Sequence, residues 1–149
     1  MTWLLSGPNA TRSVLALSFC LAAIASGCGD DEGGTESDRL GVAAECSSTD
    51  ECATYPLADG GTGQLACLTD FKGGYCGLKD CERSADCPDG ALCVAHTDGS
   101  NYCFRACAEK PECNANRTVD NEANCSSSFD WANEGDDDGS KACIPPSGK

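Results

Sequence analysis

Basic residues are scarce in this chain. Its 149 residues contain 10 Lys and Arg against 24 Asp and Glu, which gives a formal net charge of −14. A surface of that sign repels the phosphates of nucleic acids, so the composition excludes nucleic-acid binding as the function. Long apolar runs are missing as well. No run reaches the roughly 18 residues needed to cross a bilayer, which excludes a polytopic membrane protein.

Histidine and closely spaced cysteine pairs are also lacking. His96 is the only histidine, and no Cys-x2-Cys pair occurs, whereas zinc ligands usually arrive in such pairs. Asp98 and Ser100 lie near His96 in a glycine-rich loop, but loop neighbours at this spacing seldom converge on one substrate. We therefore expect His96 to be an exposed loop residue, and we expect no enzyme activity, no cofactor and no zinc site.

The N-terminus has the features of an export signal. Arg12 is its only basic residue, and an apolar run over residues 14–24 follows. The run Ile24-Ala25-Ser26-Gly27-Cys28 resembles the lipobox of bacterial lipoproteins, although the usual leucine three residues before the cysteine is Ala25 here. The resemblance implies a lipoprotein signal peptide over 1–27 and a diacylglyceryl group on Cys28. An ordinary secretory signal and a retained membrane anchor are the alternatives.

Cysteine is abundant, and its parity supports the lipoprotein reading. Of the 14 cysteines, Cys20 lies inside the apolar run and Cys28 would carry lipid. The remaining twelve can form six disulfides, whereas cleavage before an unmodified Cys28 would leave one thiol unpaired in an oxidising compartment.

Residues 28–45 are predicted to be an acidic disordered tether. The stretch 29–39 has five acids and no apolar residue, so no burial offsets the entropy of ordering it.

Spacing divides the remaining cysteines into three units of four, at residues 46–76, 77–103 and 104–149. Each unit begins with a Cys-x5-Cys gap, and an acid precedes each second cysteine: Glu51, Asp86 and Glu112. The third and fourth cysteines of units one and two flank a glycine-containing turn, which predicts a β-hairpin. The four cysteines of the units are, in order, Cys46, Cys52, Cys67 and Cys76; Cys81, Cys87, Cys93 and Cys103; Cys107, Cys113, Cys125 and Cys143.

Four cysteines allow three pairings within a unit. A bridge between the first and second would leave the hairpin unattached, so we favour first-to-third and second-to-fourth bonds. The expected fold is small and disulfide-rich: three tandem four-cysteine units with short β-hairpins and irregular loops, and little helix.

One element of unit two resembles a known module. The run Cys81-x5-Cys87-Pro-Asp-Gly-Ala-Leu-Cys93 is similar to the Asp-Cys-x2-Gly-x2-Cys element of the Dickkopf N-terminal module and of repeats in acidic bacterial surface lipoproteins. Unit one departs from it by an insertion, and neither unit ends in that module's close cysteine pair. The resemblance implies a style of fold rather than a receptor.

Binding features are few. Carboxylates gather in the last loop at Asp130, Glu134, Asp136 and Asp138 and are weak candidates for calcium, although the EF-hand pattern fails because Pro145 stands where a Glu is required. We expect a solvated acidic loop there. Aromatic residues beside cysteines are expected to cover disulfides, and Trp131 is a candidate for an exposed binding anchor.

The favoured function is that of a lipid-anchored cell-envelope protein, a non-enzymatic interaction or structural module with an unknown envelope or extracellular partner. Gly29 replaces the Asp that commonly retains bacterial lipoproteins in the inner membrane, which favours the outer membrane. One alternative is a secreted disulfide-rich inhibitor or ligand that uses the inserted loop Leu57 to Gln64. Another is a calcium-dependent adhesive module.

Overall fold

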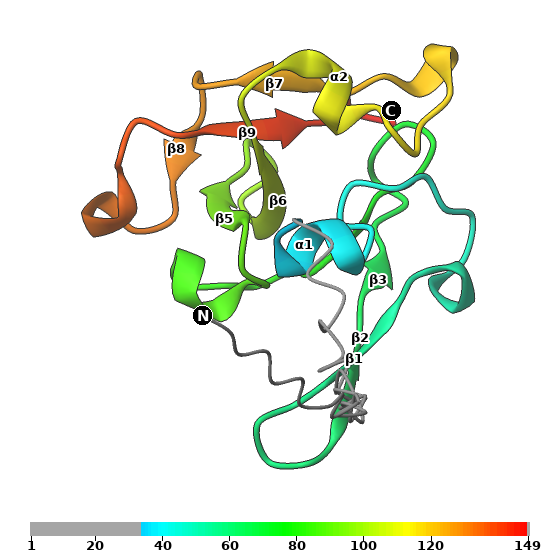
Figure 1. Cartoon of the computed structure of the whole chain (residues 1–149). Coiled ribbons are helices and arrows are strands. Elements are labelled where there is room, and N and C mark those ends of the chain that lie inside the picture. Colours follow the sequence, from blue (N-terminus) through cyan, green and yellow to red (C-terminus); the bar gives the residue numbers. More distant parts are fainter. Residues whose placement is uncertain (1–33, 149) are drawn as a thin grey trace, which may run out of the picture. The chain divides into compact units, whose positions relative to one another are not determined.

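The computed structural model describes residues 34–148 (Figure 1). The predicted signal peptide, Cys28 and residues 29–33 lie outside these residues. The helices are α1 (Glu36–Arg39) and α2 (Lys110–Cys113), with 3₁₀ turns η1 (Thr49–Glu51), η2 (Ser84–Asp86), η3 (Val119–Asn121) and η4 (Glu134–Asp136). The strands are β1 (Thr54–Pro56), β2 (Thr62–Gln64), β3 (Ala66–Cys67), β4 (Cys76–Gly77), β5 (Ala91–Ala95), β6 (Asn101–Cys107), β7 (Asn124–Ser126), β8 (Asp130–Trp131) and β9 (Lys141–Ile144). This is the small disulfide-rich fold that the sequence predicts.

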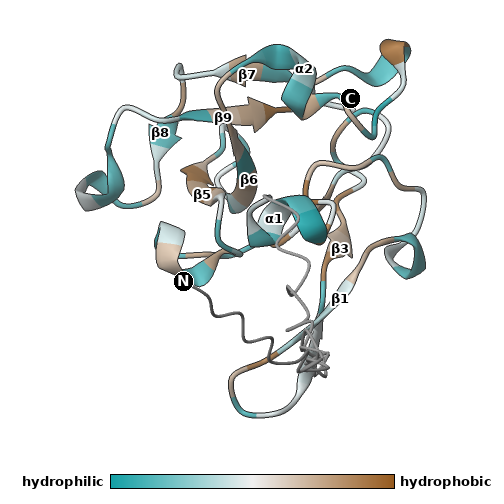
Figure 2. Ribbon diagram, viewed as in Figure 1, coloured by the Kyte–Doolittle hydropathy of each residue, from teal (hydrophilic) through white to brown (hydrophobic). Residues whose placement is uncertain are grey.

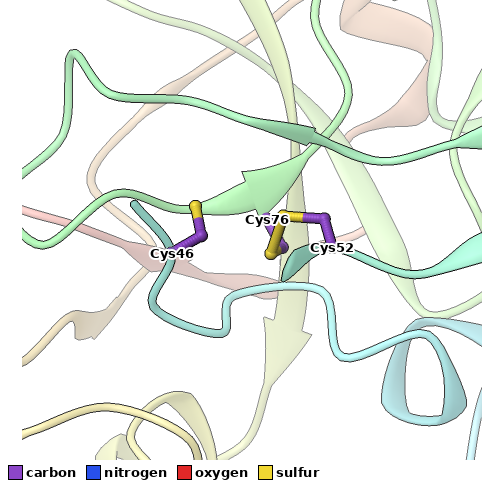
Figure 3. Close-up of side chains that lie close together, drawn as sticks. All are labelled: Cys46, Cys52 and Cys76. Carbon is purple, nitrogen blue, oxygen red and sulfur yellow. A yellow bond between two sulfur atoms is a disulfide. The ribbon is translucent and has the colours of Figure 1, made fainter. Parts of the chain in front are cut away.

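All twelve cysteines of the body are in disulfides, and the pairing is first-to-third and second-to-fourth in every unit. The bonds are Cys46–Cys67, Cys52–Cys76, Cys81–Cys93, Cys87–Cys103, Cys107–Cys125 and Cys113–Cys143. The two bonds of a unit lie together. In unit one the sulfurs of Cys46, Cys52 and Cys76 are within 4.8 Å of one another, and Figure 3 shows the Cys52–Cys76 bond beside Cys46.

The repeat is also visible in the backbone. In each unit the third and fourth cysteines face each other across two antiparallel strands: Cys67 and Cys76, Cys93 and Cys103, Cys125 and Cys143. One turn of helix, η1, η2 or α2, lies between the first and second cysteines. Each unit is therefore a short helical turn whose flanking cysteines are bonded to a pair of strands.

The acid before each second cysteine holds that helical turn. Glu51 accepts a hydrogen bond from the backbone N–H of Ser47, and Asp86 accepts one from Glu82. Glu112 does the same for Ala108. In all three units the donor is the residue directly after the first cysteine. The recurring acid thus satisfies a backbone donor at the start of the Cys-x5-Cys loop.

Units two and three are not separate bodies. Their strands form one five-stranded sheet in the order β7-β9-β6-β5-β8, at the top of Figure 1. The predicted boundary at 103/104 falls inside β6, and β8 of unit three pairs with β5 of unit two. Cysteine spacing predicts three tandem units but gives no information on strand pairing between them.

Aromatic side chains from all three units join in one core. The ring of Phe71 lies 5.1 Å from that of Tyr102, 5.5 Å from Phe104 and 6.1 Å from Tyr75, in edge-on contacts. All four side chains are buried. Such contacts contribute about 0.5–1.5 kcal/mol each beyond the area that they bury. Tyr75, Tyr102 and Phe104 therefore form one shared cluster, whereas the sequence predicts that each ring covers a disulfide.

Apolar residues mark β3, β5 and β9, and the helices α1 and α2 are hydrophilic (Figure 2).

The tether prediction is wrong for residues 35–45. Thr35 caps α1 with its side chain, and Asp38 bonds back to the Thr35 N–H. Ser37 is fully buried, and Val42 and Ala43 are 3% exposed. The polar side chains that suggest disorder instead cap α1 and form an ion pair between Asp38 and Arg105. The composition of the segment gives no indication of Arg105, because this partner is distant in the sequence. We call residues 35–45 the docked segment.

Gly74 is predicted to be indispensable to this packing. It has φ +67°, and a Cβ atom there would lie 2.0 Å from the carbonyl oxygen of Cys46. Gly74→Ala is expected to reduce the free energy of unfolding by about 3 kcal/mol, because positive φ and a backbone clash both oppose a side chain. Gly99, with φ +86° and no atom within 4 Å of such a Cβ, is the matched control. Gly99→Ala should cost about 1 kcal/mol. Equal losses in urea unfolding would contradict the prediction.

Candidate functional site

The turn of the β5–β6 hairpin, residues 96–100, holds the only histidine and is the candidate site; we call it the His96 turn. The His96 N–H donates to the Ser100 carbonyl at 2.9 Å, and Gly99 N–H donates to the His96 carbonyl at 3.0 Å. Gly99 adopts φ +86°, which closes the turn. Two strand-paired neighbours, Ala95 and Asn101, fix both ends.

The expectation that His96 is an exposed loop residue is wrong. Its side chain is 16% exposed. The imidazole ring lies edge-on to Phe71 at 5.3 Å and to Tyr102 at 5.7 Å. Phe71 belongs to unit one and reaches under the turn of unit two, so a contact between units buries the ring. The sequence around His96 does not indicate this contact with Phe71.

Polar groups converge beside His96. Its Nδ1 lies 3.3 Å from Asp98 Oδ1, and the Tyr102 hydroxyl donates to Asp98 Oδ2 at 2.8 Å. The Ser100 N–H also donates to Asp98, at 2.9 Å. The Lys79 ammonium lies 5.6 Å from the centre of the Tyr102 ring. Asp98 is therefore the centre of the polar network.

Two depressions flank the His96 turn. The polar one, about 480 Å³, is lined by Asp70, Lys79, His96, Asp98, Ser100 and Ser147. The second, about 440 Å³, is lined by Ala95, His96, Thr97, Phe129, Asp130 and Ile144 among others. His96 and Thr97 border both, so a ligand that covered them would meet polar groups on one side and apolar groups on the other. Lys79 lies between β4 and η2, and Phe129 lies between β7 and β8. The sequence around these two residues does not indicate a site.

The turn brings His96, Asp98 and Ser100 into one depression, contrary to the expectation that they would not converge. Acyl transfer needs a hydrogen bond between the nucleophile and its base. Among residues 34–148, no such bond joins the Ser100 hydroxyl to His96; the bond from Ser100 to Asp98 uses the backbone N–H. The hydrogen bonds to Asp98 hold the turn in place between the two depressions.

Trp131 is half-buried in β8 rather than exposed. It pairs with Val94 across the sheet, and its ring lies 5.2 Å from that of Phe129. Phe129, rather than Trp131, lines the depression beside the His96 turn.

The four calcium candidates do not assemble into a site. Asp136 accepts a hydrogen bond from the Ser84 N–H, and Asp138 accepts one from the Ser140 N–H at 2.9 Å. Hydrogen bonds from Ser140 hold the pKa of Asp138 below its ordinary value. Within residues 34–148, the groups of three potential ligand atoms that lie within 4.8 Å of one another consist of cysteine sulfurs, and those sulfurs are in disulfides. Asp130 and Glu134 belong to no such group.

The inserted loop from Leu57 to Gln64 forms the end of the β1–β2 hairpin, at the bottom of Figure 1. Leu57 is 41% exposed, but its N–H donates to Gly61 and its carbonyl accepts from Gly60. The tip is a closed turn, not the extended strand that would pair with the edge of a partner sheet.

Comparison of the chain with models of protein families, with curated proteins and with solved structures finds no match. Neither α1 nor α2, the two α-helices of the described part, could span a bilayer, since each has four residues. Six disulfides are typical of proteins exported to an oxidising compartment.

Acid titration should report the network at Asp98. Hydrogen bonds from Ser100 and then Tyr102 hold the pKa of Asp98 below its ordinary value of 3.8. Tyr102→Phe removes one donor, so the pKa of Asp98 should rise. Because the pKa is lower in the folded chain, the stabilisation from Asp98 is present above about pH 4 and is lost as the pH falls through the folded value.

Carboxyl NMR can follow this titration with an internal control. Asp86 also has a lowered pKa, caused by the N–H groups of Glu82 and Arg83, and it does not contact Tyr102. The titration midpoint of Asp86 should therefore be unchanged in Tyr102→Phe. An unchanged Asp98 midpoint would show that the hydroxyl does not hold the carboxylate.

Proposed function

We propose that this chain is an exported, lipid-anchored cell-envelope protein whose body is a non-enzymatic binding module. The thiol of Cys28 would take a diacylglyceryl group, and residues 1–27 would then be removed by cleavage just before it. Gly29 after the lipid site favours the outer membrane. The His96 turn and its two depressions are the surface on which binding is expected, because it combines a fixed polar network with apolar neighbours.

The pairing of the cysteines carries this proposal. Every cysteine from Cys46 to Cys143 has a partner within the body. The two left over are Cys20, inside the apolar run, and Cys28, after the small residues Ala25, Ser26 and Gly27. A lone thiol in an oxidising compartment invites wrong disulfides. Consumption of the Cys28 thiol by lipid removes that problem.

Intact mass spectrometry of envelope-derived protein tests the anchor and the disulfides together. The expected chain begins at Cys28, carries an acyl addition and gains twelve hydrogens on reduction, two for each disulfide. An unmodified chain that begins after Cys28, or a free thiol in the body, would contradict the proposal.

Detergent phase partitioning of two matched variants tests the lipid anchor by itself. Cys28→Ser should remove the acyl addition, so that a chain freed of residues 1–27 moves from the detergent phase to the aqueous phase. Cys20→Ser, which changes the other leftover cysteine, should leave it in the detergent phase. Wild-type protein in the aqueous phase would instead favour the secreted inhibitor or ligand.

A further inference from the structure

The docked segment follows the proposed lipid site, Cys28, and is bound to one end of the body. The Ser37 N–H donates to the Asp89 carbonyl at 2.8 Å, and the Asp89 N–H donates to Glu36 Oε2 at 3.1 Å. Asp38 forms an ion pair with Arg105. At Gly90 the backbone approaches Thr35 so closely that a Cβ would lie 2.3 Å from its hydroxyl. Thr35 is therefore held against the Asp89–Gly90 turn.

The C-terminal part of the docked segment is also attached to the body. The Ala43 N–H donates to the Cys76 carbonyl at 3.1 Å, and the Cys76 N–H donates to Ala44 at 2.9 Å. Val42 and Ala43 belong to the core. We call Thr35, the first residue of the docked segment, the exit point; six residues (29–34) separate it from Cys28 in the sequence. Seven Cα steps span at most about 25 Å.

That exit point lies at one end of the β5–β6 hairpin. Gly90 precedes the first residue of β5, and Arg105 pairs with Ala91 at the same end. The His96 turn closes the opposite end. β5 runs from Ala91 to Ala95, and backbone hydrogen bonds extend the pairing to Gly90 at one end and His96 at the other, a length of six residues or roughly 20 Å. The hairpin is therefore nearly as long as the greatest reach of the link to Cys28.

We infer that the docked segment orients the anchored body, with the Ala91–Arg105 end of the hairpin toward the bilayer and the His96 turn toward solution. The inference rests on lipid attachment at Cys28. Turning the hairpin over would carry the His96 turn into the bilayer surface unless most of the reach of residues 29–34 were used. The face of the body beside Thr35 is thus the membrane-facing surface, and partners meet the His96 turn from the solution side.

Energy transfer from tryptophan to a lipid probe tests this orientation. Removal of the signal peptide takes Trp3 away, so Trp131 is the one tryptophan of the mature chain. In a Trp131→Phe background, Ala108→Trp places a reporter near Thr35, with which Ala108 lines one depression. Thr97→Trp places a second reporter on the far turn. Both positions are exposed. The lipidated variants are reconstituted in vesicles that contain a dansyl-headgroup lipid.

Transfer from position 108 should exceed transfer from position 97 several-fold. A long Gly/Ser insertion between Gly33 and Gly34 should abolish the difference and leave the fold and the vesicle association unchanged. Six intact disulfides, checked by mass, show that each variant is folded. Equal transfer from the two positions without the insertion would overturn the inference. Chains that do not float with the vesicles would instead refute the proposed lipid anchor.

Discussion

Replacing Cys52 and Cys76 together with alanine is expected to lower the free energy of unfolding by about 4 kcal/mol. The bond closes a loop with a sequence separation of 24 and joins η1 to β4. Both cysteines belong to the buried core. Their removal both frees the unfolded chain and takes sulfur atoms out of the packed interior.

Cys107 and Cys125 provide the comparison. Their bond has a sequence separation of 18, and both residues are half-buried at the edge of the core. Loop entropy distinguishes the two bonds by only about 0.3 kcal/mol. The larger loss for the Cys52–Cys76 pair should therefore come from packing. Urea unfolding of the two double variants measures the difference, and equal losses would mean that the disulfides act on the unfolded chain alone.

The cysteine pattern carries most of what could be predicted of this fold. Spacing that repeats three times indicates three units, and glycine turns between cysteines indicate hairpins. The need to attach each hairpin favours the pairing that the structure has. The acids at Glu51, Asp86 and Glu112 mark the repeat as well. Their role could not be predicted, because it depends on the backbone N–H that each helical turn presents.

Contacts between units could not be predicted, because local sequence does not encode them. Residues 35–45 have the composition of a tether, yet Asp38 finds Arg105 and the segment packs. His96 has the context of an exposed turn, yet Phe71 of another unit packs against it. In both cases side chains from a distant part of the sequence contribute the contacts that bury these residues. The candidate site could not be predicted for the same reason, since its walls come from several units.

Arg117 is the strongest case of such a contact, and Arg117→Lys is expected to destabilise the body by about 3 kcal/mol. The guanidinium donates to four backbone carbonyls, those of Asn121 at 2.7 Å, Ala43 at 2.9 Å, Gly74 at 3.0 Å and Lys72 at 2.7 Å. It also lies 5.8 Å from the centre of the Tyr75 ring. It thus joins the docked segment, unit one and unit three.

Lysine keeps the charge but lacks the planar fork that reaches several carbonyls at once. Some of those carbonyls would lose their donor, and the cost of an unpaired buried acceptor exceeds the net gain from making its bond. Arg83→Lys is the control, since Arg83 is exposed and its ion pair with Asp86 spans 4.0 Å; no measurable change is expected there. Amide hydrogen exchange should locate the loss, with protection reduced at Ala43 and Cys76. Full stability in Arg117→Lys would show that positive charge alone holds the three segments together.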